Sequence, residues 1–311
     1  MGSILITGNH GFVGSNLTTA LKEHHRIYGL DIDSSQKAGV IKTFGWNELE
    51  QIPPVDLIIH LAGKAHDTGN KSSGKDYFDI NVGLTEKIFQ YFLTSHSTKF
   101  IFFSSVKAIA DTVSGDFLTE DDVSDPQTEY GRSKLAAEHY LLNQLRQSNK
   151  KLYILRPCMI HGPGNKGNLN LLYQIVNKGI PWPLGSFANK RSFTAIDNLS
   201  FIINRFMEQD IEPGIYQVAD DESIGTNDLI RMISQSKGGK AKIWHINMGL
   251  IRLAARIGDI LHLPLNSERL KKLTDSYIVS NEKLKGALGI QRMPLTAKEG
   301  MSKTIDSFRT R

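Results

Sequence analysis

Short apolar runs alternate with longer amphipathic stretches through the first half of the chain. The stretches between the runs repeat apolar residues at helical spacing, as in Phe78, Val82 and Phe89. Near-continuous apolar runs are typical of strands buried on both sides in a parallel sheet, and crossovers of this length are usually helices. The pattern therefore predicts an α/β fold with a doubly wound parallel sheet. The expected strands are residues 3–7, 26–30, 56–61, 100–103 and 152–155.

The pattern changes after Pro157. A glycine-rich polar run at 161–168 follows, and later strands and helices are shorter and less regular. We predict one domain at residues 1–157, to which residues 193–208 return, and a smaller C-terminal α/β domain at 158–311.

Residues 248–261 form an amphipathic helical pattern that contains Arg252 and Arg256. Such a helix can pack its apolar face against the smaller domain, or it can lie on a membrane surface. Packing against the domain is the favoured interpretation.

Composition indicates a globular protein, with 40% hydrophobic and 22% charged residues. Cys158 is the only cysteine, so no intramolecular disulfide can form. No apolar run approaches the roughly 20 residues that a membrane span needs, and the N-terminus enters a strand pattern directly. We therefore expect a cytoplasmic protein without membrane insertion.

The formal net charge is +5, but the Lys and Arg residues are scattered and lack interleaved aromatics. This distribution is typical of surface charge and disfavours nucleic acid as a partner.

A glycine turn joins the first strand to the first helix. Thr7-Gly8 is followed by Gly11 and Gly14, so the backbone can approach a ligand and the helix can offer N–H groups to a pyrophosphate. Asp31 ends the second strand seventeen positions beyond Gly14, where a carboxylate can bind the adenosine ribose. Its charge favours NAD over NADP, although Lys37 softens that preference.

Tyr130 and Lys134 stand four residues apart, on one face of a predicted helix. A free phenol has a pKa of about 10, and a nearby ammonium would lower it. The pair could then exchange a proton with a sugar or alcohol hydroxyl. This spacing alone is common, so its weight depends on the surrounding motifs.

The segment 106–125 is rich in Asp and Glu and is expected to be a surface flap. Its acidic residues match no trusted ligand spacing, so we expect no metal.

Taken together, the motifs resemble the extended short-chain dehydrogenase/reductase family, specifically its nucleotide-sugar epimerases and reductases. The resemblance rests on the Rossmann-type glycine turn, the acidic end of the second strand, the serine pair, the Tyr–Lys pair and the later Arg-Pro and His-Gly-Pro-Gly runs. The residues are Thr7, Gly8, Gly11, Gly14, Asp31, Ala62, Gly63, Asn81, Ser104, Ser105, Tyr130, Lys134, Arg156, Pro157, His161 to Gly164 and Arg191 to Phe193.

The resemblance implies a bound NAD, a UDP-sugar substrate held by the C-terminal domain, and a homodimer. The implied catalytic residues are Ser105, Tyr130 and Lys134, with Ser104 as the alternative to Ser105. The implied cofactor-binding residues are Gly8, Gly11, Phe12, Val13, Gly14, Asp31, Leu61, Ala62, Gly63, Asn81, Ser104, Tyr130, Lys134 and Pro157. The implied substrate-binding residues are Lys64, Ser105, Lys107, Asn168 and Arg191.

The chain departs from the dehydratases of this family, because Val106-Lys107 stand where those enzymes have Asp-Glu. We expect a 4-epimerase acting on a UDP-hexose or UDP-N-acetylhexosamine through transient oxidation at carbon 4. The alternative is a 4-reductase of a UDP-4-keto-6-deoxy-N-acetylhexosamine that uses NAD(P)H. A non-catalytic NAD-binding regulatory protein is a third, less favoured, interpretation.

Overall fold

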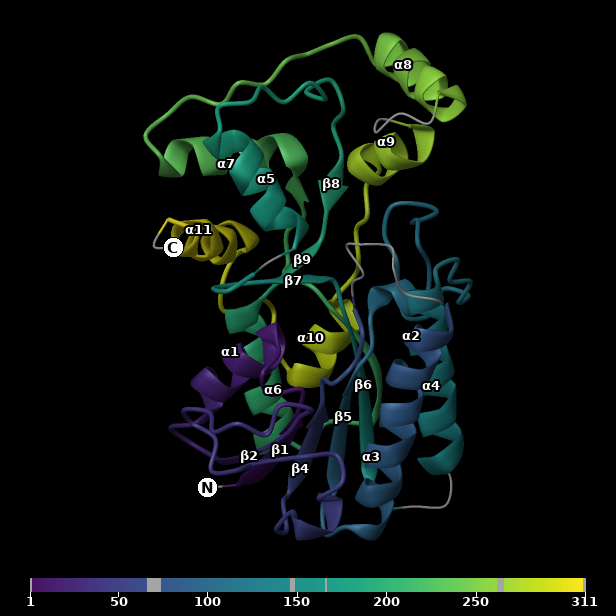
Figure 1. Ribbon diagram of the computed structural model, residues 1–311, viewed down its shortest axis with the longest axis vertical. Helices are drawn as coiled ribbons and strands as arrows, with labels where there is room; N and C mark the ends of the chain where they lie inside the picture. Colours follow the sequence, from purple (N-terminus) through teal and green to yellow (C-terminus); the bar gives the residue numbers. More distant parts are fainter. Residues whose placement is uncertain (1, 66–73, 146–148, 166, 262–265, 310–311) are drawn as a thin grey trace.

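A seven-stranded parallel sheet forms the centre of the computed structural model, which describes residues 2–65, 74–145, 149–165, 167–261 and 266–309 (Figure 1). The strand order is β10-β6-β5-β4-β1-β2-β3, and the order reverses between β1 and β4. The strands are β1 (Ser3–Thr7), β2 (Arg26–Leu30), β3 (Thr43–Phe44), β4 (Leu57–His60), β5 (Lys99–Phe103), β6 (Lys151–Pro157) and β10 (Gly214–Val218). The expected doubly wound Rossmann-type fold is confirmed.

Side chains alternate between the two faces of the sheet and build two separate cores. Ile4 and Ile6 face the helices α1, α6 and α10, whereas Leu5 faces α3 and α4. Both layers are therefore covered, which explains the continuous apolar runs. The helices are α1 (Phe12–Leu21), α2 (Gly74–Asn81), α3 (Gly83–Thr94), α4 (Glu129–Leu145), α6 (Ile196–Glu208) and α10 (Glu282–Leu288).

The remaining elements form a C-terminal lobe above the carboxyl ends of the strands (Figure 1). Its strands pair as β7 with β9 and β8 with β11. They are β7 (Met159–His161), β8 (Lys190–Arg191), β9 (Phe193–Ala195) and β11 (Ile224–Gly225). Its helices are α5 (Asn168–Asn177), α7 (Thr226–Ser236), α8 (Met248–Ile260), α9 (Ser267–Thr274) and α11 (Ala297–Ser307). Two short 3₁₀ turns, η1 (Leu49–Gln51) and η2 (Val106–Ala108), complete the described elements.

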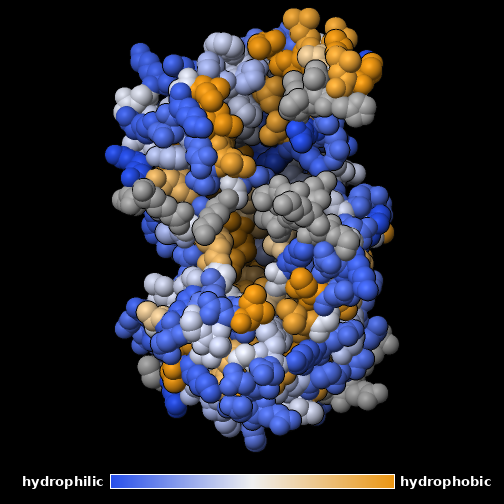
Figure 2. All heavy atoms as spheres, viewed as in Figure 1, coloured by the Kyte–Doolittle hydropathy of each residue, from blue (hydrophilic) through white to orange (hydrophobic). Residues whose placement is uncertain are grey.

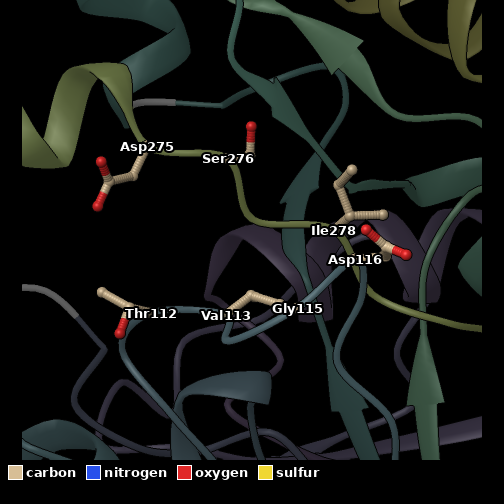
Figure 3. Close-up of a pocket in the computed structure, with 7 residues that line it drawn as sticks. All are labelled: Thr112, Val113, Gly115, Asp116, Asp275, Ser276 and Ile278. Carbon is tan, nitrogen blue, oxygen red and sulfur yellow. The ribbon is translucent and has the colours of Figure 1, made fainter.

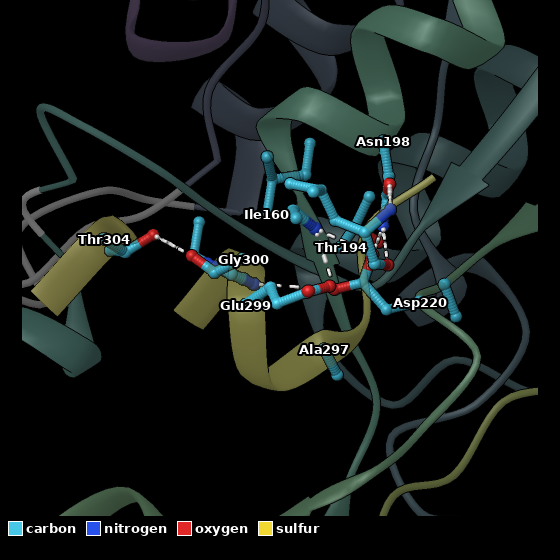
Figure 4. Close-up of polar contacts among 12 residues, drawn as sticks. Ile160, Thr194, Asn198, Asp220, Ala297, Glu299, Gly300 and Thr304 are labelled. Carbon is cyan, nitrogen blue, oxygen red and sulfur yellow. Dashed lines mark hydrogen bonds and ion pairs between the residues drawn. The ribbon is translucent and has the colours of Figure 1, made fainter. Parts of the chain in front are cut away.

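A buried polar cluster joins the sheet to this lobe (Figure 4). The Asp220 carboxylate accepts hydrogen bonds from the backbone N–H of Ala195 at 3.0 Å and from Asn198 Nδ2 at 2.7 Å. His161 Nδ1 lies 2.9 Å from the Thr304 hydroxyl on α11. The Asp220 bonds hold β9 and α6 together, and the His161 bond holds α11 against β7. Both sets are shielded from water, which strengthens them.

The acidic segment 106–125 is anchored rather than loose. Leu118 is 3% exposed and pairs with the chain near Val279 through Leu118 N to Ile278 O (2.8 Å) and Ser280 N to Leu118 O (2.9 Å). The expectation of a surface flap therefore fits only the exposed stretches on either side of Leu118.

Within the described residues, no group of three His, Cys, Asp or Glu side chains is placed to hold a metal ion.

Candidate active site

The glycine turn brings α1 close to the carboxyl ends of the central strands β1 and β4. Gly8 has φ +69°, and a Cβ there would lie 2.9 Å from the backbone nitrogen of Ala62, so only glycine fits without strain. Gly11 caps α1 without a side-chain hydrogen bond to the helix. The first-turn N–H groups, which begin at Phe12 and Val13, therefore stay available to an anion, as a dinucleotide pyrophosphate requires.

Asp31 lies at the carboxyl end of β2, beside that turn. Its Oδ2 accepts from the His10 N–H at 3.0 Å, and its Oδ1 accepts from the Ile32 N–H at 2.8 Å. Lys37 Nζ donates to the Ser15 hydroxyl at 2.6 Å and to the Asn9 carbonyl. Burial lowers the pKa of Lys37, while the charge of Asp31 opposes this shift. One acid and one base thus border the region where the adenosine ribose is expected.

A chain of hydrogen bonds from β1 through β4 to α3 fixes the loop that begins at Leu61. The Thr7 hydroxyl accepts from the N–H groups of Leu61 (3.1 Å) and Ala62 (3.0 Å), so its own proton is directed to His60 Nδ1 at 2.7 Å. His60 Nε2 then carries the ring proton toward Thr85 Oγ1 at 3.0 Å. Burial and the charge of Lys134 lower the pKa of His60 to about 3, so the ring is neutral.

Asn81 links the same loop to α4. Its Oδ1 accepts from Lys64 N at 2.7 Å, and its Nδ2 donates to Lys64 O at 3.1 Å and to Ser133 Oγ at 2.9 Å. The side chain is 1% exposed, and these bonds occupy both amide atoms. Asn81 therefore holds the backbone of Lys64, and with it the adjoining Ala62-Gly63 segment, in place. Lys64 Nζ lies 3.7 Å from Asp76 Oδ2.

Tyr130 and Ser105 meet where α4 packs against η2. A Cβ on Gly131 would lie 2.3 Å from the Lys107 carbonyl oxygen, so this close approach requires glycine. The Tyr130 hydroxyl forms a hydrogen bond with the Ser105 side chain. The Tyr77 ring lies edge-on to the Tyr130 ring with 6.4 Å between centroids.

The charge state of this pair differs from the sequence expectation. Burial raises the pKa of Tyr130, and the Ser105 hydrogen bond only partly opposes that shift. Lys134 Nζ lies on the same helix face but donates to the Phe103 carbonyl at 2.9 Å. Burial lowers the pKa of Lys134 to about 8, against the opposing charge of Glu138. The tyrosine pKa is therefore raised by burial, and the expected lowering by Lys134 is wrong for the protein alone.

A buried ion pair lies one helical turn beyond Lys134. Arg156 Nε and Nη2 donate to Glu138 Oε1 (2.9 Å) and Oε2 (2.5 Å), with the two residues 4% and 1% exposed. The Ser104 hydroxyl also donates to Glu138 Oε1. Ser104 is thus bonded away from Tyr130, whereas Ser105 faces it. Glu138 was missed in the sequence, although its place eight residues after Tyr130 puts it on the same helix face.

Two predicted substrate residues, Lys107 of η2 and Arg191 of β8, lie near enough for their charges to interact. Lys107 Nζ lies 4.4 Å from the centroid of the Tyr277 ring and 3.5 Å from Asp111 Oδ1. Burial lowers the pKa of Lys107, and the nearby charge of Arg191 contributes in the same direction. Arg191 donates to the Asp275 carbonyl through Nε and Nη2, each at 3.3 Å. A phosphate would suit this pair of cations.

Two further predicted residues, Asn168 and Pro157, lie on other elements. Asn168 is exposed at the first turn of α5, and among the described residues no hydrogen bond joins it to Lys107 or Arg191. Pro157 is buried at the end of β6, opposite Val218 of β10.

A cavity of about 180 Å³ lies beside the Arg191 contacts. Figure 3 shows the 275–278 segment and the 112–116 segment facing each other across it. It does not include the Tyr130 pair. The cavity is lined by Thr112, Val113, Gly115, Asp116, Asp275, Ser276 and Ile278.

The doubly wound sheet and its glycine turn define the class of dinucleotide-binding α/β proteins. Residues 4–219 match the model of the NAD dependent epimerase/dehydratase family, so the chain belongs to that family. Membership makes the protein an enzyme whose cofactor is NAD, and it confirms the resemblance drawn from the sequence motifs.

Full-length relatives extend the match beyond residue 219. The chain is 28% identical to UDP-glucose 4-epimerase of Vibrio cholerae, over 98% of this chain and 95% of that protein. It is 26% identical to N-acetyl-alpha-D-glucosaminyl-diphospho-ditrans,octacis-undecaprenol 4-epimerase of Escherichia coli O157:H7, over 97% and 94%.

Solved structures share the whole fold. UDP-N-acetylglucosamine 4-epimerase from Bacillus cereus superposes with a TM-score of 0.78 at 18% identity, covering 99% of this chain and all of that one. MoeE5 in complex with UDP-glucuronic acid and NAD gives the same TM-score and identity, with 99% of each chain covered.

Proposed function

We propose that this protein is a nucleotide-sugar 4-epimerase acting on a UDP-hexose or UDP-N-acetylhexosamine. The observation that carries the proposal is the hydrogen bond between Tyr130 and Ser105 at the sheet edge, with Lys134 on the same helix face. The names of the two full-length relatives, both 4-epimerases, support the position of the reacting carbon.

In the proposed reaction, Tyr130 removes the proton of the 4-hydroxyl group and later returns it to the ketone oxygen. Ser105 hydrogen-bonds the same oxygen and keeps it within reach of the phenol. NAD, when bound, supplies the hydride acceptor and then the hydride donor at carbon 4. The glycine turn and the first turn of α1 would hold its pyrophosphate, and Asp31 its adenosine ribose.

Lys134 supplies the positive charge that the phenolate needs. The pKa of Tyr130 is raised in the protein alone, so the phenol is protonated there. Lys134 carries its proton below about pH 8, because burial lowers its pKa only to that value. A turn of its ammonium away from the Phe103 carbonyl would place this charge near the reacting phenol and favour its ionised form.

Epimerisation also requires that the sugar present both faces of carbon 4. We propose that Lys107 and Arg191 hold the diphosphate while the sugar turns, because a fixed anion leaves the distal ring free to rotate. Lys64, the remaining predicted substrate cation, lies beside Tyr77, with its Nζ 5.5 Å from the centroid of the Tyr77 ring.

The test uses purified protein and three substrates. Denaturation should release NAD in near-stoichiometric amount, and UDP-glucose or UDP-N-acetylglucosamine should be interconverted with its 4-epimer without consuming added NADH. Net NADH or NADPH consumption with a UDP-4-keto-6-deoxy sugar, and no interconversion, would overturn the epimerase in favour of the 4-reductase. Cofactor binding without turnover of any of them would favour a regulatory protein.

A second candidate is the same chemistry on a sugar diphosphate attached to a polyprenol, the substrate named for the Escherichia coli relative. The exposed apolar side of α8 favours it.

The homodimer is also kept as a proposal, and sedimentation velocity would test it.

A further inference from the structure

Helix α8 carries two apolar faces, and only one of them is packed. Ile251 and Ala255 belong to a core with Trp182, Leu184 and Leu270, as expected for packing against the lobe. The opposite face carries large apolar side chains at helical spacing. These are Leu250, Leu253, Ile257 and Ile260, with exposed fractions of 62%, 54%, 45% and 75%.

This stripe is part of a larger apolar surface. Leu261 continues it at 61% exposure directly after the helix ends. Figure 2 shows hydrophobic side chains gathered at the end of the molecule where Figure 1 places α8. A row of exposed Leu and Ile side chains along one helix is unusual for a protein surface and indicates a contact with something apolar.

The part of the chain that contains the stripe is basic. Residues 240–275 contain seven Lys or Arg and three Asp or Glu, so this segment carries a net charge of +4 out of the +5 of the whole chain. Arg252 and Arg256 are both exposed on α8, and within the described residues neither has an ion-pair partner. Of the acidic residues, Asp259 accepts from Ser267, and Glu268 is paired with Lys272.

We propose that α8 docks on the surface of an anionic lipid bilayer, with the stripe in the acyl boundary and Arg252 and Arg256 among the headgroups. A helix with one apolar face and flanking arginines has the chemistry of an interfacial helix. Among the described residues, no helix combines the length and apolar character that crossing a membrane would require. The contact is therefore peripheral.

Charge decides between a bilayer and a second copy of the chain. A twofold pairing of this face would bring two surfaces of the same positive charge together. An anionic bilayer instead complements that charge, at about 1 kcal/mol for each Lys or Arg near the surface. The solvent-facing side of α8 is therefore better matched to an anionic bilayer than to the same side of a second copy of the chain.

Docking through α8 would leave the cofactor side free. Figure 1 places α8 and α9 at the end of the C-terminal lobe that is remote from the sheet. The lobe that carries Arg191 would then face the membrane, and the glycine turn of β1 would face the solution.

The experiment is co-sedimentation of the full chain with vesicles. Vesicles of phosphatidylcholine with about one third phosphatidylglycerol are compared with phosphatidylcholine alone, at about 0.05 M and about 0.5 M salt. We expect binding to the anionic vesicles that falls at least about tenfold at high salt or without phosphatidylglycerol. Equal binding to both vesicle types, or none to either, would overturn the proposal.

Variants separate the stripe from general stickiness. Leu253→Asp with Ile257→Asp should reduce vesicle binding at least about tenfold, since each buried charge is costly at the lipid boundary. The control, Val123→Asp with Leu171→Asp, changes two apolar residues elsewhere that are 88% and 52% exposed, and it should bind like the wild type. Equal loss in both doubles, or in neither, contradicts an α8 contact.

A charge variant and two further measurements complete the design. Arg252→Gln with Arg256→Gln keeps the stripe and should weaken binding to anionic vesicles while leaving the fold intact, as circular dichroism would verify. Sedimentation velocity without lipid should show the same oligomer for wild type and the Leu253→Asp, Ile257→Asp variant; dissociation of an oligomer in the variant would assign the stripe to a second copy. UDP-sugar turnover is measured in parallel, so failure of the epimerase proposal is distinguishable from failure of lipid binding.

Discussion

On the sheet side of the candidate site, polar side chains are buried and bonded to other side chains, whereas the predicted substrate cations Lys107 and Arg191 contact main-chain carbonyls and the Asp111 carboxylate. Glu138 and Arg156 are at most 4% exposed and bonded to each other through two hydrogen bonds. Lys107, by contrast, has a side chain 37% exposed, and Arg191 is bonded only to main-chain oxygen atoms.

This difference separates two tasks. Proton transfer requires atoms held within a few tenths of an ångström, which rigid strands and one helix provide. Holding a diphosphate requires cations that can exchange their partners when the ligand arrives, and carbonyl oxygens are easily exchanged for phosphate oxygens. We therefore expect substitutions on the sheet side to change rate or stability and those on the lobe side to change affinity.

The largest expected effect is that of Tyr130→Phe, which removes the hydroxyl bonded to Ser105. Epimerisation should fall about 10³-fold, equivalent to about 4 kcal/mol, because the group that takes and returns the hydroxyl proton is removed. The amount of NAD released on denaturation should not change. Tyr77→Phe, an aromatic neighbour with 6.4 Å between ring centroids, is the matched control. Full turnover by Tyr130→Phe would remove the catalytic assignment.

Glu138→Gln tests the rigid side through stability. The substitution leaves the Arg156 guanidinium buried without a full countercharge, which should cost about 3–5 kcal/mol in urea unfolding. The pKa of Lys134 should also fall below about 8, because Glu138 now raises it. Lysine Cε NMR titration measures that shift. Asp228→Asn, which breaks an exposed pair with Arg231, should cost less than about 1 kcal/mol. Equal costs for the two variants would contradict the comparison.

Arg191→Ala tests the adaptable side. We expect KM for the UDP-sugar to rise about 10–100-fold, or about 1.4–3 kcal/mol, with kcat changed only a few-fold. Arg191→Lys should recover part of this loss, since it keeps the charge but not the planar fork. The control is Lys190→Ala on the same strand, an exposed neighbour. An unchanged KM in Arg191→Ala would place the diphosphate elsewhere.

At neutral pH the smallest effect is expected from the titration of His60, because its ring gains a proton only in acid. Its folded pKa of about 3 lies below the unfolded value of about 6.5, so the unfolded chain binds the proton first as pH falls. This residue therefore contributes full stability above about pH 6.5. The contribution falls by up to about 1.4 kcal/mol per pH unit from there toward pH 3. Urea unfolding of wild type and His60→Gln across that range measures it, with exposed His245→Gln as control. Parallel pH profiles for wild type and His60→Gln would show that the ring is not held neutral.

The sheet and the glycine turn were predictable because their signals are local. A buried parallel strand must be apolar along its whole length, and a turn such as that at Gly8 must lack a Cβ. The Tyr130–Lys134 spacing likewise follows from helix geometry. Residues that share one helix face can be named without knowing what packs against them.

Other features depend on partners that lie far apart in sequence. Arg156 reaches Glu138 only after β6 and α4 have packed. Burial of Tyr130, which also depends on that packing, raises the tyrosine pKa instead of lowering it. Helical periodicity identified α8 as amphipathic but could not tell which of its two apolar faces would be buried. The assignment of individual site residues stays a prediction for the same reason.

The chain passes back and forth between the core around the sheet and the core of the C-terminal lobe. It leaves the sheet after β6, returns with α6 and β10, leaves again, and returns with α10 before ending in α11. Neither half is therefore one continuous stretch of sequence that could be excised, expressed alone or exchanged with a relative at a single junction. New specificity in this enzyme must arise by point substitutions and loop changes within an intact chain, and a chimaera made by one splice would lack part of both cores.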